Sequence, residues 1–345
     1  MKNSKTGATL LAVLAALLYA INMPASKLLL RDVPPTVMAG LLYLGAGIGI
    51  GLLYLFLGRG TQNQKLARAD LPFVIGMILL DIAAPILLML GLRLTNSANA
   101  SLLNNFEIVA TALIALFIFK EAISGTLWLA ILLVTLASAI LSFEGAAGLH
   151  FSGGSLLVLA AASCWGLENN FTRKISSKNT FQIVILKGIF SGLGSLLVAR
   201  LQGQAMPAIN LIAIVMLLGF VAYGLSIFFY IKAQNVIGAA KTSAWYAIAP
   251  FAGAFLSFLF LREALTSQYL IALLVMLLGS ALVVADTMAK SHAHTHSHVL
   301  RHYHEGLEHS HSVTHTHEHR HILATERHAH QHPPEITSDP QHDHA

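Results

Sequence analysis

The stretch VPPTVMAGLLYLGAGIGIGLLYLFL, residues 33–57, decides the fold class, because no charged side chain interrupts it. A helix rises about 1.5 Å per residue, so about 20 apolar residues cross the hydrocarbon core of a bilayer. Residues 9–24 form a second uncharged run upstream. We interpret both runs as membrane-spanning helices. The upstream run is a first span and not a signal peptide, because it lacks a convincing small-residue cleavage site and more spans follow.

Composition extends this interpretation to most of the chain. Of the 345 residues, 55% are hydrophobic and 11% are charged, whereas an average soluble domain has about 25% charged residues. Short polar breaks separate ten apolar segments. The expected spans are residues 8–30, 34–57, 71–92, 98–119, 124–143, 153–172, 180–201, 209–230, 240–261 and 268–286. The sequence therefore predicts an all-α polytopic membrane protein, with the lipid bilayer as its surroundings.

Several function classes are disfavoured by the same pattern. The pI near 9.3 does not indicate a nucleic-acid partner, because the basic residues stand one to three at a time between apolar runs, as topological signals do. No nucleophile-base pair or cofactor loop is visible, so we expect neither an enzyme nor a required cofactor. The single cysteine, Cys164, excludes an internal disulfide.

Basic residues in the breaks predict the orientation, since the face richer in Lys and Arg is usually cytoplasmic. The richer face would hold Lys2, Lys5, Arg59, Lys65, Arg68, Lys120, Arg173, Lys174, Lys178, Lys232, Lys241 and Lys290. The other face would hold Lys27, Arg31, Arg93, Arg200 and Arg262. Both termini are then expected to be cytoplasmic, in a protein of the plasma (inner) membrane.

The two halves of the membrane body, residues 1–147 and 148–288, resemble each other weakly. The matching elements are Tyr19, Asn22 and Lys27 with Trp165, Glu168 and Arg173, and Phe119-Lys120-Glu121 with Leu261-Arg262-Glu263. Five spans per half is an odd number, so the second half would enter the membrane from the opposite side. This predicts an inverted repeat, an architecture of many secondary transporters.

These features together resemble the EamA-type transporters of the drug/metabolite transporter superfamily. The resemblance covers about residues 8–286 and rests on the ten spans, the aromatic-small-x-Asn-x4-Lys element from Tyr19 to Lys27, and the Glu after the fourth and ninth spans. It implies a small-molecule substrate, a central cavity between the halves, and export as the likelier direction of transport.

Two carboxylates are expected deep in the membrane. Asp81 and Glu107 lie about ten residues to either side of the break after Arg93, which places both near the midplane. If they faced one cavity they would repel, and one would keep its proton. That arrangement suits a proton-coupled carrier or a cationic substrate. The alternative is that one of them bonds a neighbouring helix and shapes packing.

Further polar residues complete the candidate site. Glu168 and Lys187 are expected at a similar depth, where they would either pair with each other or contact substrate. Amides and aromatic rings elsewhere would line the cavity, or else serve helix packing and interfacial anchoring. The full candidate set for substrate binding or coupling is Asn22, Asp81, Asn104, Glu107, Trp165, Glu168, Lys187 and Tyr246.

Residues 289–345 form a separate histidine-rich segment. It holds all of the 18 histidines except His150. Few of its side chains are large and apolar, so we expect a disordered cytoplasmic tail. Neutral imidazole binds Zn, Ni, Co and Cu, so the tail is a predicted site for these ions. The candidate ligands are His292, His294, His296, His298, His315, His317, His319, His321, His328, His330 and His332.

The sequence therefore favours a secondary transporter that moves a small metabolite or drug-like solute by alternating access. Two alternatives stay open. One is a divalent-metal exporter for Zn, Ni or Co that the tail supplies or regulates. The other is a non-transporting membrane metal sensor or reservoir. A homodimer is also left open.

Overall fold

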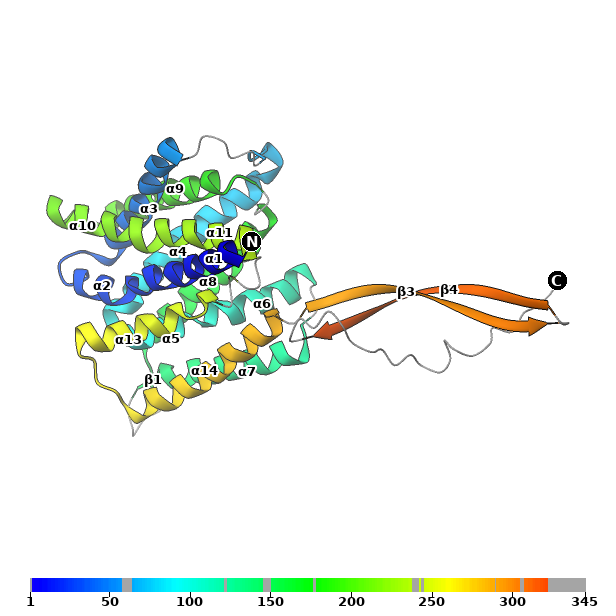
Figure 1. The fold of residues 1–345 in the computed structure, drawn as a ribbon. Coiled ribbons are helices and arrows are strands. Elements are labelled where there is room, and N and C mark those ends of the chain that lie inside the picture. The colour runs from blue at the N-terminus through cyan, green and yellow to red at the C-terminus, as the bar shows by residue number, and fades with distance from the viewer. Residues whose placement is uncertain are drawn as a thin grey trace. The chain divides into compact units, whose positions relative to one another are not determined.

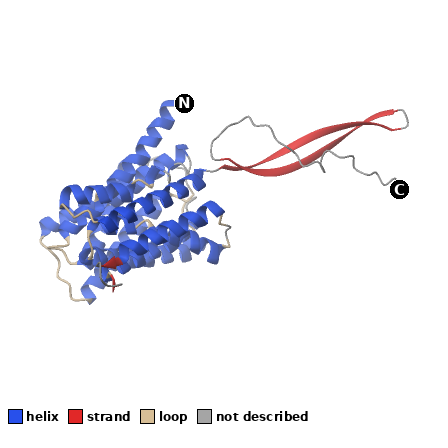
Figure 2. Ribbon diagram, turned by 90° about the horizontal axis from the view of Figure 1, so that it is seen from below, coloured by secondary structure: helices blue, strands red, loops and turns tan. Residues whose placement is uncertain are grey.

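The computed structural model describes residues 2–57, 64–120, 123–144, 150–175, 178–237, 242, 245–288, 290–304 and 307–321. Residues 1–284 form one compact unit, and residues 285–345 form a second one. The first unit is a bundle of antiparallel helices, shown from two directions in Figures 1 and 2. Its helices follow the apolar runs of the sequence to within a few residues at most ends.

The helices of the first half are α1 Lys2–Ala20, α2 Asn22–Leu29, α3 Pro35–Leu57, η1 Arg68–Asp70, α4 Leu71–Leu94, α5 Ser97–Leu103, α6 Phe106–Phe119 and α7 Gly125–Ser142. Those of the second half are α8 Gly153–Ile175, α9 Thr180–Leu201, α10 Ile209–Gly219, the π-helical segment η2 Phe220–Leu225, α11 Ser226–Ile237, α13 Ala249–Leu261 and α14 Ser267–Met288. Two short strands, β1 Phe143–Glu144 and β2 His150–Phe151, pair between the halves.

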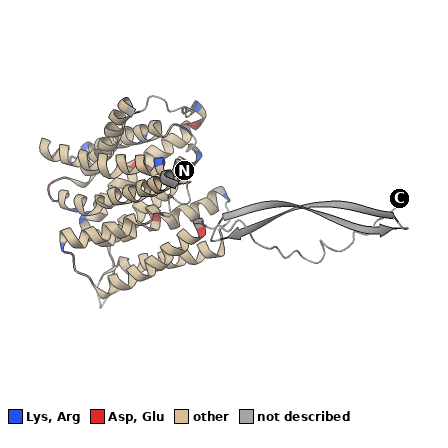
Figure 3. Cartoon of the chain, in the orientation of Figure 1, with Lys and Arg blue, Asp and Glu red and all other residues tan. Residues whose placement is uncertain are grey.

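The all-α membrane fold is confirmed. Eight helical stretches in the described part are long and apolar enough to cross a bilayer, and Ala249–Leu261 is a shorter apolar helix. The remaining span is the sixth, α8, which has 23 residues but carries Glu168, Asn169 and Asn170. Figure 3 shows that Lys and Arg lie mostly toward the ends of the helices. The long stretches between these ends suit the hydrocarbon layer.

Small residues let the central helices approach closely. A Cβ atom added at Gly188 of α9 would lie 2.4 Å from Gly47 Cα of α3, and one added at Gly45 would lie 2.0 Å from the Met216 carbonyl oxygen of α10. Large apolar side chains are exposed on the outside of the bundle instead, for example Phe56, which is 81% exposed. Close contact through small residues is how membrane helices associate, because lipid is as apolar as leucine.

The fourth and ninth spans share two structural details, as the predicted repeat requires. Each is interrupted by a turn, at Asn104–Asn105 and at residues 247–248, before a final helix of 14 residues in α6 and 13 in α13. Each final helix ends at a basic residue with positive φ, Lys120 at 58° and Arg262 at 53°. In the described part of the chain these two are the non-glycine residues with positive φ, and they occupy the matching positions that the sequence indicated.

The second unit contains an antiparallel hairpin of β3 (Lys290–His304) and β4 (Leu307–His321). The described part of the tail thus differs from the disordered segment that we expected. Alternation of His with other residues has the two-residue period of a strand, although a lone two-stranded hairpin is marginally stable in water. The register pairs His292 with His319 and His294 with His317. His328, His330 and His332 lie outside the described residues.

Candidate functional site

Four interrupted spans meet in the middle of the bundle. The first span breaks at Ile21, between α1 and α2, and the fourth breaks at Asn104–Asn105. The eighth passes through η2, and the ninth turns just before α13. Interrupted helices in transporters expose backbone groups around the substrate, and π-helical turns are frequent at functional sites. Polar side chains from these spans and from α4, α8 and α9 gather in two groups.

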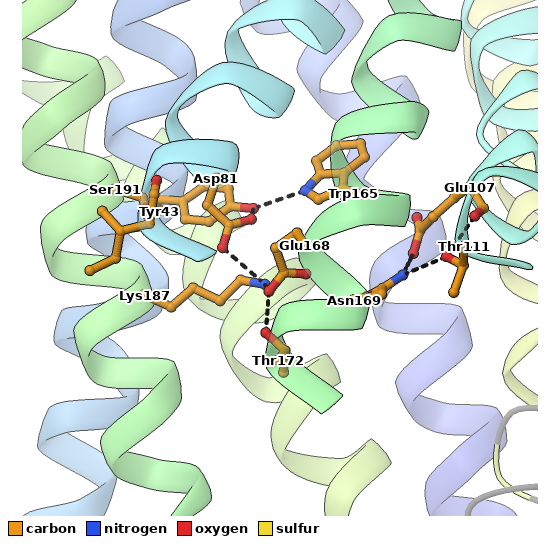
Figure 4. Close-up of polar contacts among 11 residues, drawn as sticks. Tyr43, Asp81, Glu107, Thr111, Trp165, Glu168, Asn169, Thr172, Lys187 and Ser191 are labelled. Carbon is orange, nitrogen blue, oxygen red and sulfur yellow. Dashed lines mark hydrogen bonds and ion pairs between the residues drawn. The ribbon is translucent and has the colours of Figure 1, made fainter. Parts of the chain in front are cut away.

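The first group is an ion triad of Asp81 on α4, Glu168 on α8 and Lys187 on α9, drawn in Figure 4. Lys187 Nζ lies 3.1 Å from Asp81 Oδ2 and 3.0 Å from Glu168 Oε1. The Asp81 pair has the distance of an ion pair but not the angles of a hydrogen bond, since Oδ2 accepts none. Both carboxylates are buried, and Lys187 is nearly so. The Lys187 ammonium therefore pairs with both carboxylates.

Hydrogen bonds fix the triad from several sides. The Tyr43 hydroxyl donates to Asp81 Oδ1 over 2.9 Å, and Trp165 Nε1 donates to the Tyr43 oxygen over 3.3 Å. The Thr172 hydroxyl, one turn after Glu168 on α8, donates to Glu168 Oε1. Figure 4 shows these side chains pointing toward one another from neighbouring helices. The carboxylates are thus held by neutral donors as well as by Lys187, which is what a buried charge requires.

The second group is a tyrosine cluster, which comprises Tyr19, Tyr43, Tyr223, Tyr230 and Tyr246. The ring centroids are 5.7 Å apart for Tyr19 and Tyr223, and 6.0 Å apart for Tyr19 and Tyr246. Tyr43 continues the cluster toward the ion triad, with its centroid 5.4 Å from that of Tyr223. Rings at such separations pack favourably edge to face or offset. The cluster therefore connects the breaks of the first, eighth and ninth spans.

Glu107 lies at the start of α6 beside this cluster. Its Oε1 accepts a hydrogen bond of 2.7 Å from Asn169 Nδ2 of α8. Glu107 is half-buried, and it is near enough to Tyr19 and Tyr246 to interact with them electrostatically. Figure 4 shows it apart from the triad, on the far side of α8.

Two amides at the break of the fourth span have unused hydrogen-bonding atoms. Asn104 Nδ2 donates to the Tyr19 hydroxyl over 3.3 Å, while Asn104 Oδ1 is buried and has no partner among the described residues. Asn105 Nδ2 is likewise buried and unpartnered. Buried polar atoms without partners are unusual in native proteins. A solute held at this break would satisfy them.

Asp81, Glu168 and Lys187 form the triad, and Tyr246 belongs to the tyrosine cluster. Asn22, Asn104 and Trp165 each donate to a tyrosine of the cluster, whereas Glu107 bonds Asn169. Asn22 Nδ2 donates to the Tyr223 hydroxyl over 3.0 Å. Glu168 and Lys187 pair, which was one of the two options. Asp81 and Glu107 do not meet: Glu168 is the carboxylate next to Asp81, because α8 lies between α4 and α6. Depth along a helix was estimated well, but the direction in which each side chain points was not.

Sequence reasoning gave too little weight to three tyrosines. Tyr19, Tyr43 and Tyr223 stand at the centre of the site, whereas Trp165 and Tyr246 had been favoured among the aromatics. The signal that could have identified Tyr223 is its place as a tyrosine well inside the expected span 209–230. Nothing in the local sequence marks the π-helical segment that carries it.

Two charged residues of the repeated motifs have structural contacts instead. Lys27 Nζ donates to the carbonyl oxygens of Leu92 and Thr95, each over 2.6 Å, at the end of α4. The Glu263 carboxylate accepts from the backbone N–H groups of Ser97 and Ala98, over 2.7 and 2.8 Å, at the start of α5. Opposite charges at the two ends of helices complement the helix dipole.

The candidate metal ligands lie outside both groups, in the tail. In the part of the membrane body that the structure describes, no cluster of three or more His, Cys, Asp and Glu residues has the arrangement of a metal site.

A helical membrane bundle whose interrupted spans converge on a buried polar centre belongs to the class of membrane transporters. Comparison with protein families agrees: the model described as the EamA-like transporter family matches residues 6–143 and again residues 152–285. The chain therefore belongs to the EamA-like transporter family. The two matches correspond to the two five-helix halves.

Relatives with curated descriptions are also transporters. An uncharacterized transporter of Methanothermobacter thermautotrophicus (strain Delta H) is 26% identical over 287 residues, which cover 77% of this chain and 83% of that protein. The uncharacterized transporter YyaM of Bacillus subtilis (strain 168) is 23% identical over 223 residues, covering 62% of this chain and 73% of the relative. A crystal structure described only as that of a protein aligns with a TM-score of 0.59 at 19% identity, over 80% of this chain and 95% of the other, and so shares the fold.

Proposed function

We propose that this membrane transporter moves a small organic solute by alternating access through the site at the four broken spans. The observation that carries the proposal is that the polar contacts of the site join the two halves. Asn22 of α2 contacts Tyr223 of η2, Glu107 of α6 contacts Asn169 of α8, and Asp81 of α4 contacts Lys187 of α9. Rocking of one half against the other would therefore change the site directly.

The ion triad supports proton coupling. Two carboxylates and one ammonium carry a net charge of −1, and charge away from water is unfavourable in the membrane interior. A proton on either carboxylate would remove that net charge and free Lys187 to pair with the other. Because Asp81 and Glu168 belong to different halves, the choice between them would differ between two arrangements of the halves. We propose export as the direction, with both termini in the cytoplasm.

Accessibility from both sides of the membrane tests alternating access without knowledge of the substrate. Tyr246→Cys, made in a Cys164→Ser background, is treated with a membrane-impermeant maleimide in right-side-out and in inside-out vesicles. We expect labelling in both preparations, because the site opens in turn to each side. Labelling from one side alone, under all conditions, would contradict the proposal. Asp32→Cys, at an end of the bundle, is the matched control, and it should be labelled from one side.

Coupling is tested with a pH-sensitive dye trapped inside proteoliposomes. Labelled metabolites are screened for flux first, and the vesicles are then challenged with any solute that is carried. We expect solute movement to change the internal pH in the wild type and not in Asp81→Asn or Glu168→Gln. Flux without a proton signal in the wild type would contradict coupling and leave transport standing.

A further inference from the structure

Resting on the transport function proposed above, we infer that the solute carries a positive charge, and that Glu107 together with the rings of Tyr19, Tyr223 and Tyr246 recognises it as a protonated amine or quaternary ammonium group. This names a substrate class for the site at the broken spans. The inference rests on ring geometry, on the balance of donors and acceptors, and on the distribution of charge.

The rings form a surface that suits a cation. Tyr19 lies between Tyr223, at a centroid distance of 5.7 Å and an interplanar angle of 80°, and Tyr246, at 6.0 Å and 42°. The three rings thus lie together, with Tyr19 in edge-to-face contact with Tyr223 and tilted against Tyr246. Aromatic faces carry negative electrostatic potential and attract ammonium groups within about 6 Å of the centroid. Tyr19 and Tyr246 are both half-buried, so a solute can reach them.

The amide donors near the rings are mostly used within the protein. Asn22 Nδ2 donates to Tyr223, and Asn104 Nδ2 donates to Tyr19. Asn169 Nδ2 donates to Glu107. The tyrosine hydroxyls and Asn105 Nδ2 are neutral donors, and the Asn104 carbonyl oxygen is a neutral acceptor. The Glu107 carboxylate is the one charged group among these, so an N–H-bearing cation matches the set and an anion does not.

Charge separates the two groups of the site. Lys187 Nζ lies within ion-pair distance of both Asp81 and Glu168. Glu107, by contrast, has no basic partner among the residues that the structure describes, and its hydrogen bond comes from a neutral amide. An intramembrane carboxylate of this kind requires a proton or a cation. The inference assigns the cation to the solute, and it leaves proton coupling to the ion triad.

The test compares three solutes that share one skeleton and differ in charge: 2-phenylethylamine, 2-phenylethanol and phenylacetate. Binding of each to the purified full-length protein is measured by isothermal titration calorimetry and by thermal shift. We expect the amine to bind at least tenfold more tightly than the alcohol, and the carboxylate to bind weakest. Tighter binding of the alcohol or of the carboxylate, or no preference for the amine, would overturn the inference.

Variants connect that preference to the named residues. Glu107→Gln should lose at least tenfold in amine affinity, and Glu107→Asp should recover part of it. Tyr19→Phe, which keeps the ring, should bind the amine more tightly than Tyr19→Leu. The control is Asp70→Asn, since Asp70 pairs with Lys178 outside the site, and it should bind as the wild type does. Amine binding that survives Glu107→Gln would also overturn the inference.

The two-sided labelling of Tyr246→Cys keeps the two proposals apart. A protein that is labelled from both sides and that prefers a neutral or anionic solute retains the proposed transport function and loses the inferred substrate class. A protein that is labelled from one side alone loses the transport function itself.

Discussion

At the scale of single residues, one ammonium group holds two carboxylates together inside the bundle. Lys187 Nζ lies 3.1 Å from Asp81 and 3.0 Å from Glu168. Removing one partner of a buried ion pair is destabilising by about 3–5 kcal/mol, because a charge is left unpaired. We expect Lys187→Met to lower the melting temperature of the detergent-solubilised protein strongly. Combining it with Asp81→Asn and Glu168→Gln should restore most of the loss.

The matched control for this prediction is a second Lys–Asp pair, which lies outside the triad. Lys178 Nζ lies 3.8 Å from Asp70 Oδ2, and both side chains are partly exposed. Exposed pairs contribute about 0–1 kcal/mol, so Lys178→Met should change the melting temperature little. Equal losses of melting temperature in the two lysine variants would show that water reaches the triad and weakens its ion pairs as it does at the surface.

Glu263 offers a second residue-scale prediction. Its carboxylate accepts hydrogen bonds of 2.7 and 2.8 Å from the first two N–H groups of α5, and hydrogen bonds to charged groups contribute about 1.5–3 kcal/mol. We expect stability to fall from wild type to Glu263→Gln, which keeps one acceptor oxygen, and further to Glu263→Ala. Thermal unfolding in detergent measures the order. An Ala variant as stable as the Gln variant would argue against the cap.

The residue scale also shows where sequence reasoning stops. Position along a span gave a similar depth for Glu168 and Lys187, which made their pairing one of two options. It could not give the side of the helix, so the sequence left open whether Asp81 faces Glu107, whereas Glu168 is its neighbour. Rotation about a helix axis is set by packing against neighbours, which an apolar run does not encode when the helix is hydrophobic all round.

At the scale of elements, α3 and α9 approach each other closely through glycine. A Cβ atom at Gly188 would lie 2.4 Å from Gly47 Cα, and one at Gly47 would lie 2.6 Å from the Ile189 backbone nitrogen. Backbone atoms cannot move aside as a flexible side chain can, and overpacking is destabilising by about 1–3 kcal/mol. We expect Gly47→Ala and Gly188→Ala to lower the melting temperature and the yield of folded protein.

Gly51 on the same helix is the control, since a Cβ atom added there meets nothing within 4 Å. Alanine is favoured over glycine in a helix by about 1 kcal/mol in water, so Gly51→Ala should be neutral or slightly stabilising. A loss at Gly51 as large as that at Gly47 would mean that glycine matters in α3 for flexibility and not for the approach of α9.

Elements differ in how far the sequence predicts them. Long apolar runs bounded by charges or by Pro-Pro gave the spans, because the bilayer fixes their length. Pro24 and Pro250 lie close to the breaks of the first and ninth spans, as their missing N–H groups suggest. The break at Asn104–Asn105 contains neither Pro nor Gly, and Pro85 leaves α4 continuous. Pro and Gly alone therefore do not predict these two cases.

At the scale of the whole molecule, polar contacts join the two halves around the site. Closely packed small residues join them away from it. Besides the contacts of the site, Ser97 and Ser257 hydroxyls meet at 2.8 Å, and Ser101 donates to the Pro250 carbonyl. A polar interface can exchange partners without exposing apolar surface to water. The repeat, which the sequence indicated through two short motifs, thus supplies both the symmetry and the interface that alternating access needs.

The tail supplies the prediction that separates the carrier from its alternatives. Deleting residues 291–345 removes all histidines except His150. If the body is the carrier, solute flux in proteoliposomes should be unchanged, while Zn²⁺ or Ni²⁺ retained by the purified protein should fall to background. The control variant keeps the tail length and replaces its histidines with Asn, which should lose the metal without losing flux.

Acidification should have the same effect on the bound metal as the Asn variant. A protonated imidazole has no lone pair for a metal ion, so Zn²⁺ should be retained above the ordinary histidine pKa of about 6.5 and released below it. A metal exporter fed by the tail predicts instead that Zn²⁺ flux exists and falls with the deletion. A sensor or reservoir predicts that neither protein carries any solute. Flux that is the same with and without the tail contradicts both, because transport would then belong to the helices alone.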